Sequence, residues 1–321
     1  MSVESTRHLG IRMQRDHRHR FRGAFTLIEL LVVVSIVALL VAILLPALSG
    51  ARLRSQSVLC LARLRTLADG WHMYADDFDD VAVPGRMANL GGGTGNPANW
   101  YDVGNGLKYR PRWIAAMGRY VGVYGFDMPR TDYDRQDYDS KAYQCPAVPD
   151  WVDERNGAFG YNHQFLGNGR QTAGQFHNFP VNRSSIASFG GTVLAADCMG
   201  TAAGLSADRR AAYGNDATGF DQLGNHGWTL DPPRLTALSD VGSGDPGSPR
   251  TAVDPRHLGK ANAIFCDGHG QTEAPYSLGY RIRGDGSYAD TDGGDLRPTN
   301  YWFSGTGRDD DPPPKPGTTP S

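Results

Sequence analysis

Carboxylate and imidazole side chains gather near the C-terminal end of the sequence. His257 is followed after nine residues by Asp267 and Gly268, with His269 next to them and Asp197 earlier in the chain. Mixed carboxylate and imidazole ligands suit a divalent metal ion, although calcium prefers oxygen ligands that histidines do not supply. A second interpretation is structural, because Asp267 can cap backbone amides and Gly268 can take a positive φ in a tight turn after a buried strand. A metal site and a hydrogen-bonded hairpin therefore both stay open.

The cysteines are the other side chains that could do chemistry, and there are four of them: Cys60, Cys145, Cys198 and Cys266. No two share a short metal-type spacing such as Cys-x-x-Cys, so a zinc ribbon is not expected. In an oxidising compartment they could form disulfides, for example between Cys60 and a strand of a folded domain. Each could equally be a small, buried apolar residue.

Catalytic signatures are not found in the sequence. It contains no Gly-x-Ser-x-Gly, His-Glu-x-x-His or phosphate-binding-loop pattern, so we expect no enzymatic activity. The chain has 321 residues, with 32 basic and 34 acidic side chains and a net charge of -2. This balance disfavours general binding to polyanions, and we expect no nucleic-acid partner.

An isolated carboxylate, Glu29, lies in the most apolar segment of the chain. Residues 25–45 contain only Thr26, Glu29 and Ser35 as polar side chains. As a helix they would extend roughly 31 Å, which matches the hydrocarbon core of a bilayer at about 30 Å. A carboxylate in hydrocarbon is unfavourable unless it is neutralised or paired. We therefore expect a membrane-spanning helix in which Glu29 has a partner.

A basic leader precedes this apolar segment. Residues 1–24 contain six arginines against Glu4 and Asp16, so the positive-inside rule places the leader in the cytoplasm and the rest of the chain outside. A secretory signal peptide is disfavoured, because the apolar run exceeds the usual length of about 7–15 residues and no small-x-small cleavage site follows it. The alternative is an uncleaved signal anchor that holds a periplasmic binding or enzymatic domain.

The residues between the leader and the apolar segment resemble a known processing site. The run Gly23-Ala24-Phe25-Thr26-Leu27-Ile28-Glu29-Leu30 is similar to the cleavage site of type IV prepilins and type II secretion pseudopilins. The resemblance implies that prepilin peptidase cuts before Phe25, that the new N-terminus is methylated, and that Glu29 pairs with the terminal amine of a neighbouring subunit. The family usually has Gly directly before the Phe, so the cut falls after Ala24 or after Gly23. Cleavage after Ala24 keeps the family's spacing to Glu29.

The apolar segment and the residues that follow it predict a single long helix with two different halves. Residues 25–45 would form a transmembrane or filament-core part, and residues 46–75 an amphipathic part in which apolar side chains recur every three or four positions. Pro46 lies where helices of this family are kinked or melted, which fits the hydrogen bond that proline removes. A plain helix end at Pro46 is the alternative. The expected fold is α+β and pilin-like, with the distal half of the helix packed on a β-rich head.

The rest of the chain predicts short strands and long loops. Strand-sized apolar runs bounded by Gly, Pro, Asp or Asn occur at 81–83, 142–145, 192–196 and 262–266. The last residues contain three aspartates followed by three prolines and are expected to be disordered. The predicted segments are a leader (1–24), a long helix (25–75), a β-rich periplasmic or extracellular head (76–303) and a disordered tail (304–321).

A second resemblance comes from the C-terminal motif. The spacing of His257 to Asp267-Gly268 is similar to the H-x9-DG signature of a group of pilin-like proteins of planctomycete-type bacteria, and Cys145-Pro146 supports it. Together the resemblances imply a single-pass inner-membrane pseudopilin or minor pilin that acts by assembly. The implied partners are prepilin peptidase, which is also the methyltransferase, and other pilin-like subunits. No cofactor is expected beyond the divalent ion considered above, and secretion, pilus and DNA-uptake systems are all compatible.

Overall fold

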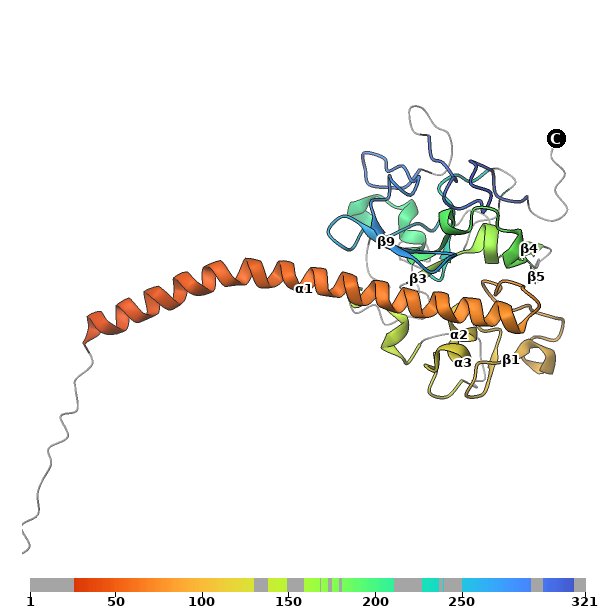
Figure 1. The fold of residues 1–321 in the computed structure, drawn as a ribbon, viewed down its shortest axis with the longest axis horizontal. Coiled ribbons are helices and arrows are strands. Elements are labelled where there is room, and N and C mark those ends of the chain that lie inside the picture. Colours follow the sequence, from red (N-terminus) through yellow and green to blue (C-terminus); the bar gives the residue numbers. More distant parts are fainter. Residues whose placement is uncertain are drawn as a thin grey trace, which may run out of the picture. The chain divides into compact units, whose positions relative to one another are not determined.

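A long helix, α1 (Leu27–Asp77), opens the described part of the chain (Figure 1). It continues for 51 residues and includes Pro46, so a helix end at Pro46 is wrong, while the predicted kink stays a prediction. The leader and Phe25 lie outside the described residues. The computed structural model describes residues 26–129, 138–148, 159–167, 169–172, 175–178, 181–210, 227–236, 239, 250–289 and 297–314.

The chain divides into two units, Met1–Gly50 and Ala51–Ser321, and the boundary falls within α1. We call residues 27–50 the proximal half of α1 and residues 51–77 the distal half. In the proximal half every large apolar side chain is exposed, from 44% at Val41 to 81% at Leu27. A helix with no buried face has no packing partner within its own unit.

The distal half of α1 has one buried stripe within the second unit. Its buried side chains recur every three or four residues, which is the spacing of one helix face. They join a core with Phe159, Leu194 and Ile264, three residues of the central sheet. This confirms the amphipathic pattern expected for this part of the chain. The buried residues of α1 are Cys60, Leu64, Leu67, Ala68, Gly70, Trp71, Tyr74 and Ala75.

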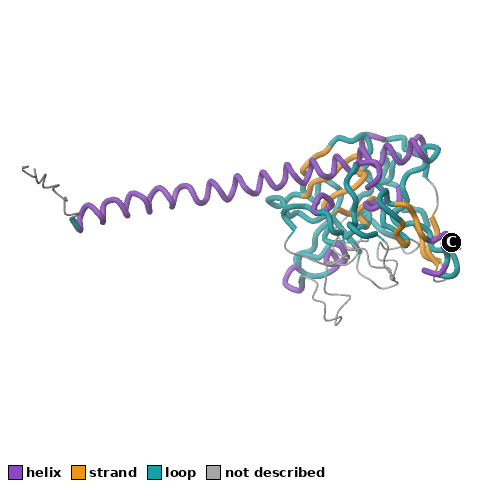
Figure 2. Tube along the Cα trace, turned by 90° about the horizontal axis from the view of Figure 1, so that it is seen from below, coloured by secondary structure: helices purple, strands orange, loops and turns teal. Residues whose placement is uncertain are grey.

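The central sheet has five strands in the order β7-β3-β6-β8-β9, drawn as orange segments in Figure 2. All neighbours pair antiparallel except β3 and β7, which are parallel. Strands β3, β6, β7 and β8 are buried along their whole length, and β9 is partly exposed. The strands are β3 (Phe159–Asn162), β6 (Val193–Asp197), β7 (Thr229–Leu230), β8 (Ala261–Phe265) and β9 (Gly270–Glu273).

Two short helices, α2 (Trp113–Ala116) and α3 (Gly118–Val121), pack against the distal half of α1. Gly70 of α1 allows this approach, because a Cβ there would lie 2.7 Å from Val121 Cγ1. Two further sheets have two strands each, β1 (Trp100–Asp102) with β2 (Leu107–Tyr109) and β4 (Gly169–Thr172) with β5 (Gln175–Asn178). The 3₁₀ helices are η1 (Gly93–Gly95), η2 (Pro97–Asn99), η3 (Lys141–Tyr143), η5 (Arg183–Ser185), η6 (Phe189–Gly191), η7 (Gly200–Gly204) and η8 (Ala207–Arg209), and η4 (His163–Gly167) is a π-helix.

The strand predictions are confirmed in two places and corrected in two. The runs at 192–196 and 262–266 correspond to β6 and β8. The run at 142–145 is not a strand, because the Ser140 hydroxyl accepts a hydrogen bond from the Ala142 N–H and starts the 3₁₀ helix η3. The run at 81–83 forms only a single bridge, from Val81 to Asn182.

The predicted disorder of the C-terminal tail is wrong for residues 304–314. Arg234 Nη1 lies 2.7 Å from Asp309 Oδ2, and Arg234 Nε lies 2.9 Å from Asp311 Oδ1. The Asn300 N–H also donates to Asp309 Oδ1 at 2.6 Å. The acidic run therefore fastens the end of the chain to the head instead of repelling it into solvent. Residues 315–321 lie outside the described residues.

These elements give an α+β architecture with a long N-terminal apolar helix and a β-rich head, where the head is the described chain after α1. The distal half of α1 belongs to the core of this second unit. Trp71 Nε1 donates to the Tyr161 hydroxyl at 2.9 Å and joins the helix to the centre of the sheet. The expected α+β, pilin-like fold class is confirmed.

Candidate functional site

The predicted processing site lies at the edge of the described chain. Gly23, Ala24 and Phe25 are outside the described residues, and Thr26 is the first residue with a described position. Helix α1 begins one residue later, at Leu27. The predicted cleavage point therefore lies two or three residues before the start of the helix, and both cleavage bonds considered from the sequence stay open.

Glu29 has a partner in its own chain. Its Oε2 accepts hydrogen bonds from the Thr26 N–H at 2.8 Å and from the Thr26 hydroxyl at 2.7 Å. In return, the Thr26 hydroxyl accepts from the Glu29 N–H at 3.2 Å. This reciprocal arrangement is a capping box, in which Thr26 is the N-cap and Glu29 the third helical residue. The Thr-x-x-Glu spacing predicts it, and the sequence analysis missed this second role of Glu29.

The exposed surface of the proximal half is almost entirely apolar. Its two serines do not interrupt this property, because Ser35 Oγ donates to the Leu31 carbonyl at 2.7 Å and Ser49 Oγ donates to the Leu45 carbonyl at 2.9 Å. Hydroxyls that are satisfied within the helix can enter hydrocarbon at little cost. Among the described residues, α1 is the one helix long and apolar enough to cross a membrane.

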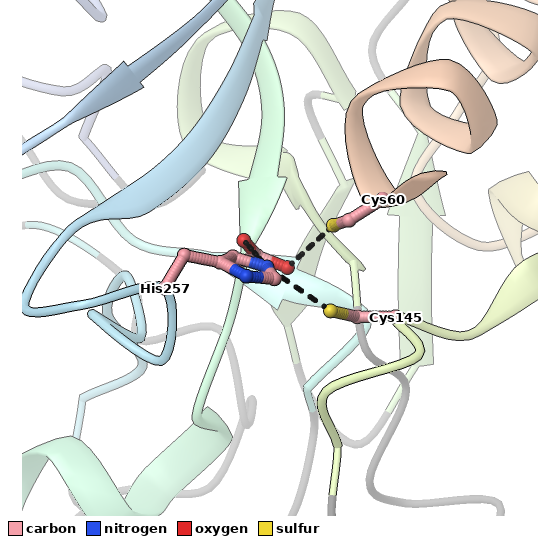
Figure 3. A group of neighbouring side chains, drawn as sticks. Cys60, Cys145 and His257 are labelled. Carbon is pink, nitrogen blue, oxygen red and sulfur yellow. Dashed lines mark hydrogen bonds and ion pairs between the residues drawn. The ribbon is translucent and has the colours of Figure 1, made fainter. Parts of the chain in front are cut away.

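Four metal-type side chains converge in the second unit, from four separate elements (Figure 3). Cys60 belongs to the distal half of α1, and Cys145 follows the 3₁₀ helix η3. Asp197 ends strand β6, and His257 precedes strand β8. We call these residues the Cys-Asp-His cluster. All four are buried, with at most 4% of any residue exposed.

The donor atoms of the Cys-Asp-His cluster lie close together. Cys60 Sγ donates to Asp197 Oδ1 at 3.2 Å, and Cys145 Sγ is 3.2 Å from His257 Nε2. His257 Nε2 is also 3.2 Å from Asp197 Oδ2. One donor atom from each residue can be chosen so that all four lie within 4.8 Å of one another. The four side chains therefore point at a common centre.

The cluster changes the protonation behaviour of its members. Hydrogen bonds from the Cys60 thiol and from His257 lower the pKa of Cys145 to about 6, although burial opposes this. Burial also lowers the pKa of His257, but its contacts with Asp197 and Cys145 outweigh burial and raise this pKa to about 9. Burial raises the pKa of the Cys60 thiol. The cluster thus favours a negative sulfur at Cys145 beside a positive imidazole.

A cysteine beside a histidine and an aspartate also suggests a nucleophile relay, but the geometry does not fit one. In such a relay the nucleophile and the carboxylate contact opposite nitrogens of the imidazole. Here Cys145 Sγ and Asp197 Oδ2 both contact His257 Nε2. Cys145 is also only 2% exposed, which leaves its sulfur inaccessible to a substrate. The arrangement suits a shared central ligand better than proton transfer.

His257 is positioned by a tight turn. The N–H of His257 donates to the Lys260 carbonyl at 2.9 Å, and the N–H of Lys260 donates back at 3.1 Å. The two residues between them, Leu258 and Gly259, have φ values of 56° and 81°. Positive φ at both central residues is typical of a type I′ turn. The backbone therefore holds the imidazole at a fixed place just before β8.

The Asp267-Gly268 pair forms the turn at the other end of β8. Gly268 has φ 85°, its N–H donates to the Phe265 carbonyl at 2.9 Å, and the Phe265 N–H donates to the His269 carbonyl at 2.9 Å. Asp267 Oδ1 accepts from the His269 N–H at 3.1 Å. The hydrogen-bonded hairpin considered from the sequence is therefore present. The nine residues of the motif's spacing contain the turn at Leu258 and Gly259 and strand β8, and they end where the second turn begins.

The four metal candidates considered from the sequence do not form one group. Asp197 and His257 belong to the Cys-Asp-His cluster, whereas Asp267 Oδ1 and His269 Nδ1 pair with each other at 2.5 Å on the exposed hairpin turn. Contacts with His269 lower the pKa of Asp267 even though burial opposes them. The Asp267 carboxylate is paired within the turn after β8. Of the four predicted ligands, only Asp197 and His257 therefore lie together.

All four cysteines are free and buried in this structure, and the disulfide considered from the sequence stays a prediction. Cys198 Sγ donates to the Thr229 carbonyl at 3.2 Å, and Cys266 lies in the core around Trp71. Cys60 and Cys145 were missed as partners of Asp197 and His257, because these residues are far apart in sequence and show no spacing pattern.

Comparison with known proteins identifies one feature. Residues 19–45 match the prokaryotic N-terminal methylation motif. No curated protein and no solved structure matches the chain. The motif and the apolar proximal half of α1 support a type IV pilin-like protein, with the processing by a prepilin peptidase and the assembly with other pilin subunits that this motif implies. They are also compatible with a membrane-anchored, single-pass protein.

Proposed function

We propose that this protein is a structural subunit, a pseudopilin or minor pilin, of a type II secretion or type IV pilus-like filament. The observation that carries the proposal is that two features occupy the same residues. The methylation motif at residues 19–45 overlaps the proximal half of α1, whose large apolar side chains are all at least 44% exposed. Such a surface requires lipid or other apolar helices around it.

The proposed life cycle has a membrane state and a filament state. In the membrane, the leader lies in the cytoplasm, the proximal half spans the inner membrane, and the head lies outside. Prepilin peptidase then removes the leader and methylates the new N-terminus at Phe25. In the filament, the proximal halves of neighbouring subunits pack together, and helix packing offsets the loss of contact with lipid.

Glu29 takes two roles in this proposal. Its hydrogen bonds with Thr26 satisfy the carboxylate within the chain and start the helix. In the filament, the same carboxylate pairs with the terminal amine of a neighbour, an interaction that the low dielectric of a helix-packed core strengthens. Partial satisfaction by Thr26 makes the membrane state tolerable before that partner arrives.

The H-x9-DG resemblance belongs to the same proposal. We assign the chain to the pilin-like group that bears this motif, and we attribute the motif's spacing to the β8 hairpin. His257 at one end contacts Asp197 and Cys145, while Gly268 turns the chain at the other end. The head acts by assembly rather than by catalysis in this proposal.

The test of the proposed function is the chemical state of the N-terminus. Intact mass and N-terminal sequencing are measured on the protein from its native membrane, in a strain with active prepilin peptidase and in a matched strain with an inactive one. We expect a methylated Phe25 in the first strain and the full leader in the second. A chain that begins at Met1 or Ser2 in both strains would instead identify α1 as an uncleaved anchor and refute the proposal.

A further inference from the structure

We propose that Cys60, Cys145, Asp197 and His257 bind one Zn²⁺ ion that fastens the distal half of α1 to the head. Each residue offers one ligand atom, and these atoms all lie within 4.8 Å of one another in a buried site. Two thiolates, one imidazole and one carboxylate are ligand types that zinc binds in tetrahedral sites. The inference is independent of the proposed filament role, because it depends only on the interior of the second unit.

The distances between the ligand atoms suit a tetrahedral ion. With Zn–S bonds of about 2.3 Å and Zn–N or Zn–O bonds of about 2.0 Å, neighbouring ligand atoms of a tetrahedron are about 3.3–3.8 Å apart. The contacts from Cys60 Sγ to Asp197 Oδ1, from Cys145 Sγ to His257 Nε2, and from His257 Nε2 to Asp197 Oδ2 are each 3.2 Å. These contacts use both oxygens of Asp197, and with one ligand atom from each residue all pairs lie within 4.8 Å, so side-chain shifts of about 1 Å or less would bring the four atoms to tetrahedral distances.

A second layer of contacts orients the ligands. The Asn262 N–H donates to Asp197 Oδ2 at 2.8 Å, and the type I′ turn at Leu258 and Gly259 fixes His257. Asn262 also links the helix to the hairpin, since its Nδ2 donates to the Ser57 carbonyl at 3.0 Å. Hydrogen bonds of this kind hold metal-binding carboxylates and histidines in place.

The ligand types select zinc over calcium and magnesium. Those hard cations take mostly oxygen ligands, and the cluster offers a single carboxylate. Zinc binds thiolates and a neutral imidazole, so protons carried by these ligands leave as the ion enters. Burial of all four residues leaves no opening for a substrate. The site is therefore a closed, structural one in which the protein supplies all four ligands.

A disulfide between Cys60 and Cys145 is the competing outcome for these sulfurs. It would use two of the four side chains and leave Asp197 and His257 as a buried ion pair. Zinc uses all four and compensates the buried carboxylate directly. The two outcomes differ in metal content and in chain mass, so one sample distinguishes them.

The experiment uses the full chain, purified from membranes in mild detergent without chelator. Zinc content is measured by elemental analysis, and the zinc X-ray absorption edge gives its ligands. We expect about one zinc per chain, bound by two sulfurs near 2.3 Å and two nitrogen or oxygen atoms near 2.0 Å. Because this measurement is made on the unmodified protein, it does not depend on whether any variant folds.

Variants assign the ligands. Cys145→Ser should reduce bound zinc to less than about a tenth of the unmodified level, because it removes one of the two thiolates. Cys198→Ser is the matched control, since Cys198 is also buried but donates to the Thr229 carbonyl, as a serine hydroxyl can. It should retain the ion. Full zinc binding by Cys145→Ser would contradict the assignment.

Two results on the unmodified chain would overturn the proposal. One is a folded protein that binds no zinc after incubation with the metal while all four thiols remain titratable. The other is a peptide containing a Cys60–Cys145 disulfide, with a chain mass about two hydrogens lower and no metal. The N-terminal processing experiment is unaffected by either result, so failure of this inference and failure of the proposed function are distinguishable.

Discussion

The two halves of α1 both contain leucines, but these leucines have opposite surroundings. In the proximal half, Leu39 and Leu40 are 63% and 54% exposed, whereas in the distal half Leu64 and Leu67 are 0% and 1% exposed. The distal half alternates its apolar stripe with arginines, but the proximal half is apolar on every face. The distribution of apolar residues around the helix therefore decides whether its partner is the head of the same chain or something outside it.

The comparison gives each half a distinct role. The distal half is part of a folded core and contributes to the stability of the head. The proximal half contributes nothing to that core, so contacts with lipid and with neighbouring helices constrain its sequence instead. A substitution in the distal half should change the stability of the head and leave membrane retention unchanged, and one in the proximal half should do the reverse. Single variants therefore test the comparison.

The largest effect is expected from Trp71→Ala in the distal half. Trp71 is fully buried and donates to the Tyr161 hydroxyl at 2.9 Å. Its truncation leaves a cavity and an unpaired phenol, and should lower the free energy of unfolding by about 3–5 kcal/mol. Thermal and chemical denaturation of the detergent-solubilised chain, followed by circular dichroism, measure this change. Membrane retention should be unchanged, and a loss smaller than about 1 kcal/mol would contradict the role given to the stripe.

The next effect is expected from Val37→Arg near the middle of the apolar segment. Arginine at the centre of a membrane helix costs about 2.5–3.5 kcal/mol, so membrane retention and assembly should both fall. Membrane fractionation measures the first and recovery of filaments the second.

Val58→Arg is the control, because Val58 is 68% exposed but lies in the distal half. It should change stability by less than about 0.5 kcal/mol and leave retention intact. Equal effects of the two arginine substitutions would remove the distinction between the halves.

A smaller effect separates the two roles of Glu29. Thr26→Ala removes the N-cap and should destabilise the start of the helix by about 1 kcal/mol, with a modest loss of assembly. Glu29→Ala removes the cap's partner and the carboxylate that pairs with a neighbour's amine, so it should impair assembly severely while insertion into the membrane stays intact. Filament recovery from both variants measures the difference, and Thr26→Ser should resemble the unmodified chain. Equal defects in Thr26→Ala and Glu29→Ala would reduce Glu29 to a helix cap.

The smallest effect concerns a polar fastening at the end of the distal half. Arg183 Nη2 lies 2.7 Å from Asp76 Oδ1, and Arg183 Nε lies 2.9 Å from Asp80 Oδ1. Hydrogen bonds from Ser184 and from Arg183 lower the pKa of Asp80. A carboxyl whose pKa is lowered by folding stabilises the fold above its unfolded pKa of about 3.9, and this contribution is lost as the pH falls through the folded value.

We therefore expect the thermal midpoint of the unmodified chain to fall more steeply than that of Asp80→Asn between about pH 4 and pH 2. Because the Asp80 side chain is still 32% exposed and solvent screens the pair, the difference should be small. If the thermal midpoints of the two proteins fall equally over this pH range, Asp80 makes no such contribution to stability.

The sequence predicted the long elements and missed the contacts between distant ones. Helix α1 and strands β6 and β8 follow from local periodicity and apolar runs, which one stretch of sequence contains in full. The apolar run at 142–145 predicts a strand, but the cap at Ser140 outweighs this preference and starts a 3₁₀ helix at Lys141–Tyr143. The composition of residues 304–314 predicts disorder, and it does not reveal Arg234, which is distant in sequence and binds the acidic run.

The candidate site was predictable only in part, for the same physical reason. Asp197 and His257 were recognised by their ligand types, but Cys60 and Cys145 join them through the packing of α1 against the sheet. Nothing in the spacing of these four residues signals their meeting. The turn at Asp267 and Gly268, by contrast, is local and was correctly expected as one interpretation.

The central claim is that other subunits surround the proximal half of α1 after processing, and site-specific photo-crosslinking in the native membrane tests it most directly. A photoreactive side chain is placed at Val37 or, as the comparison, at the buried Leu67. We expect Val37 to crosslink to pilin-like subunits only when prepilin peptidase is active, and Leu67 to crosslink only within its own chain. Val37 adducts that are identical with active and inactive peptidase and contain no other subunit would contradict the account.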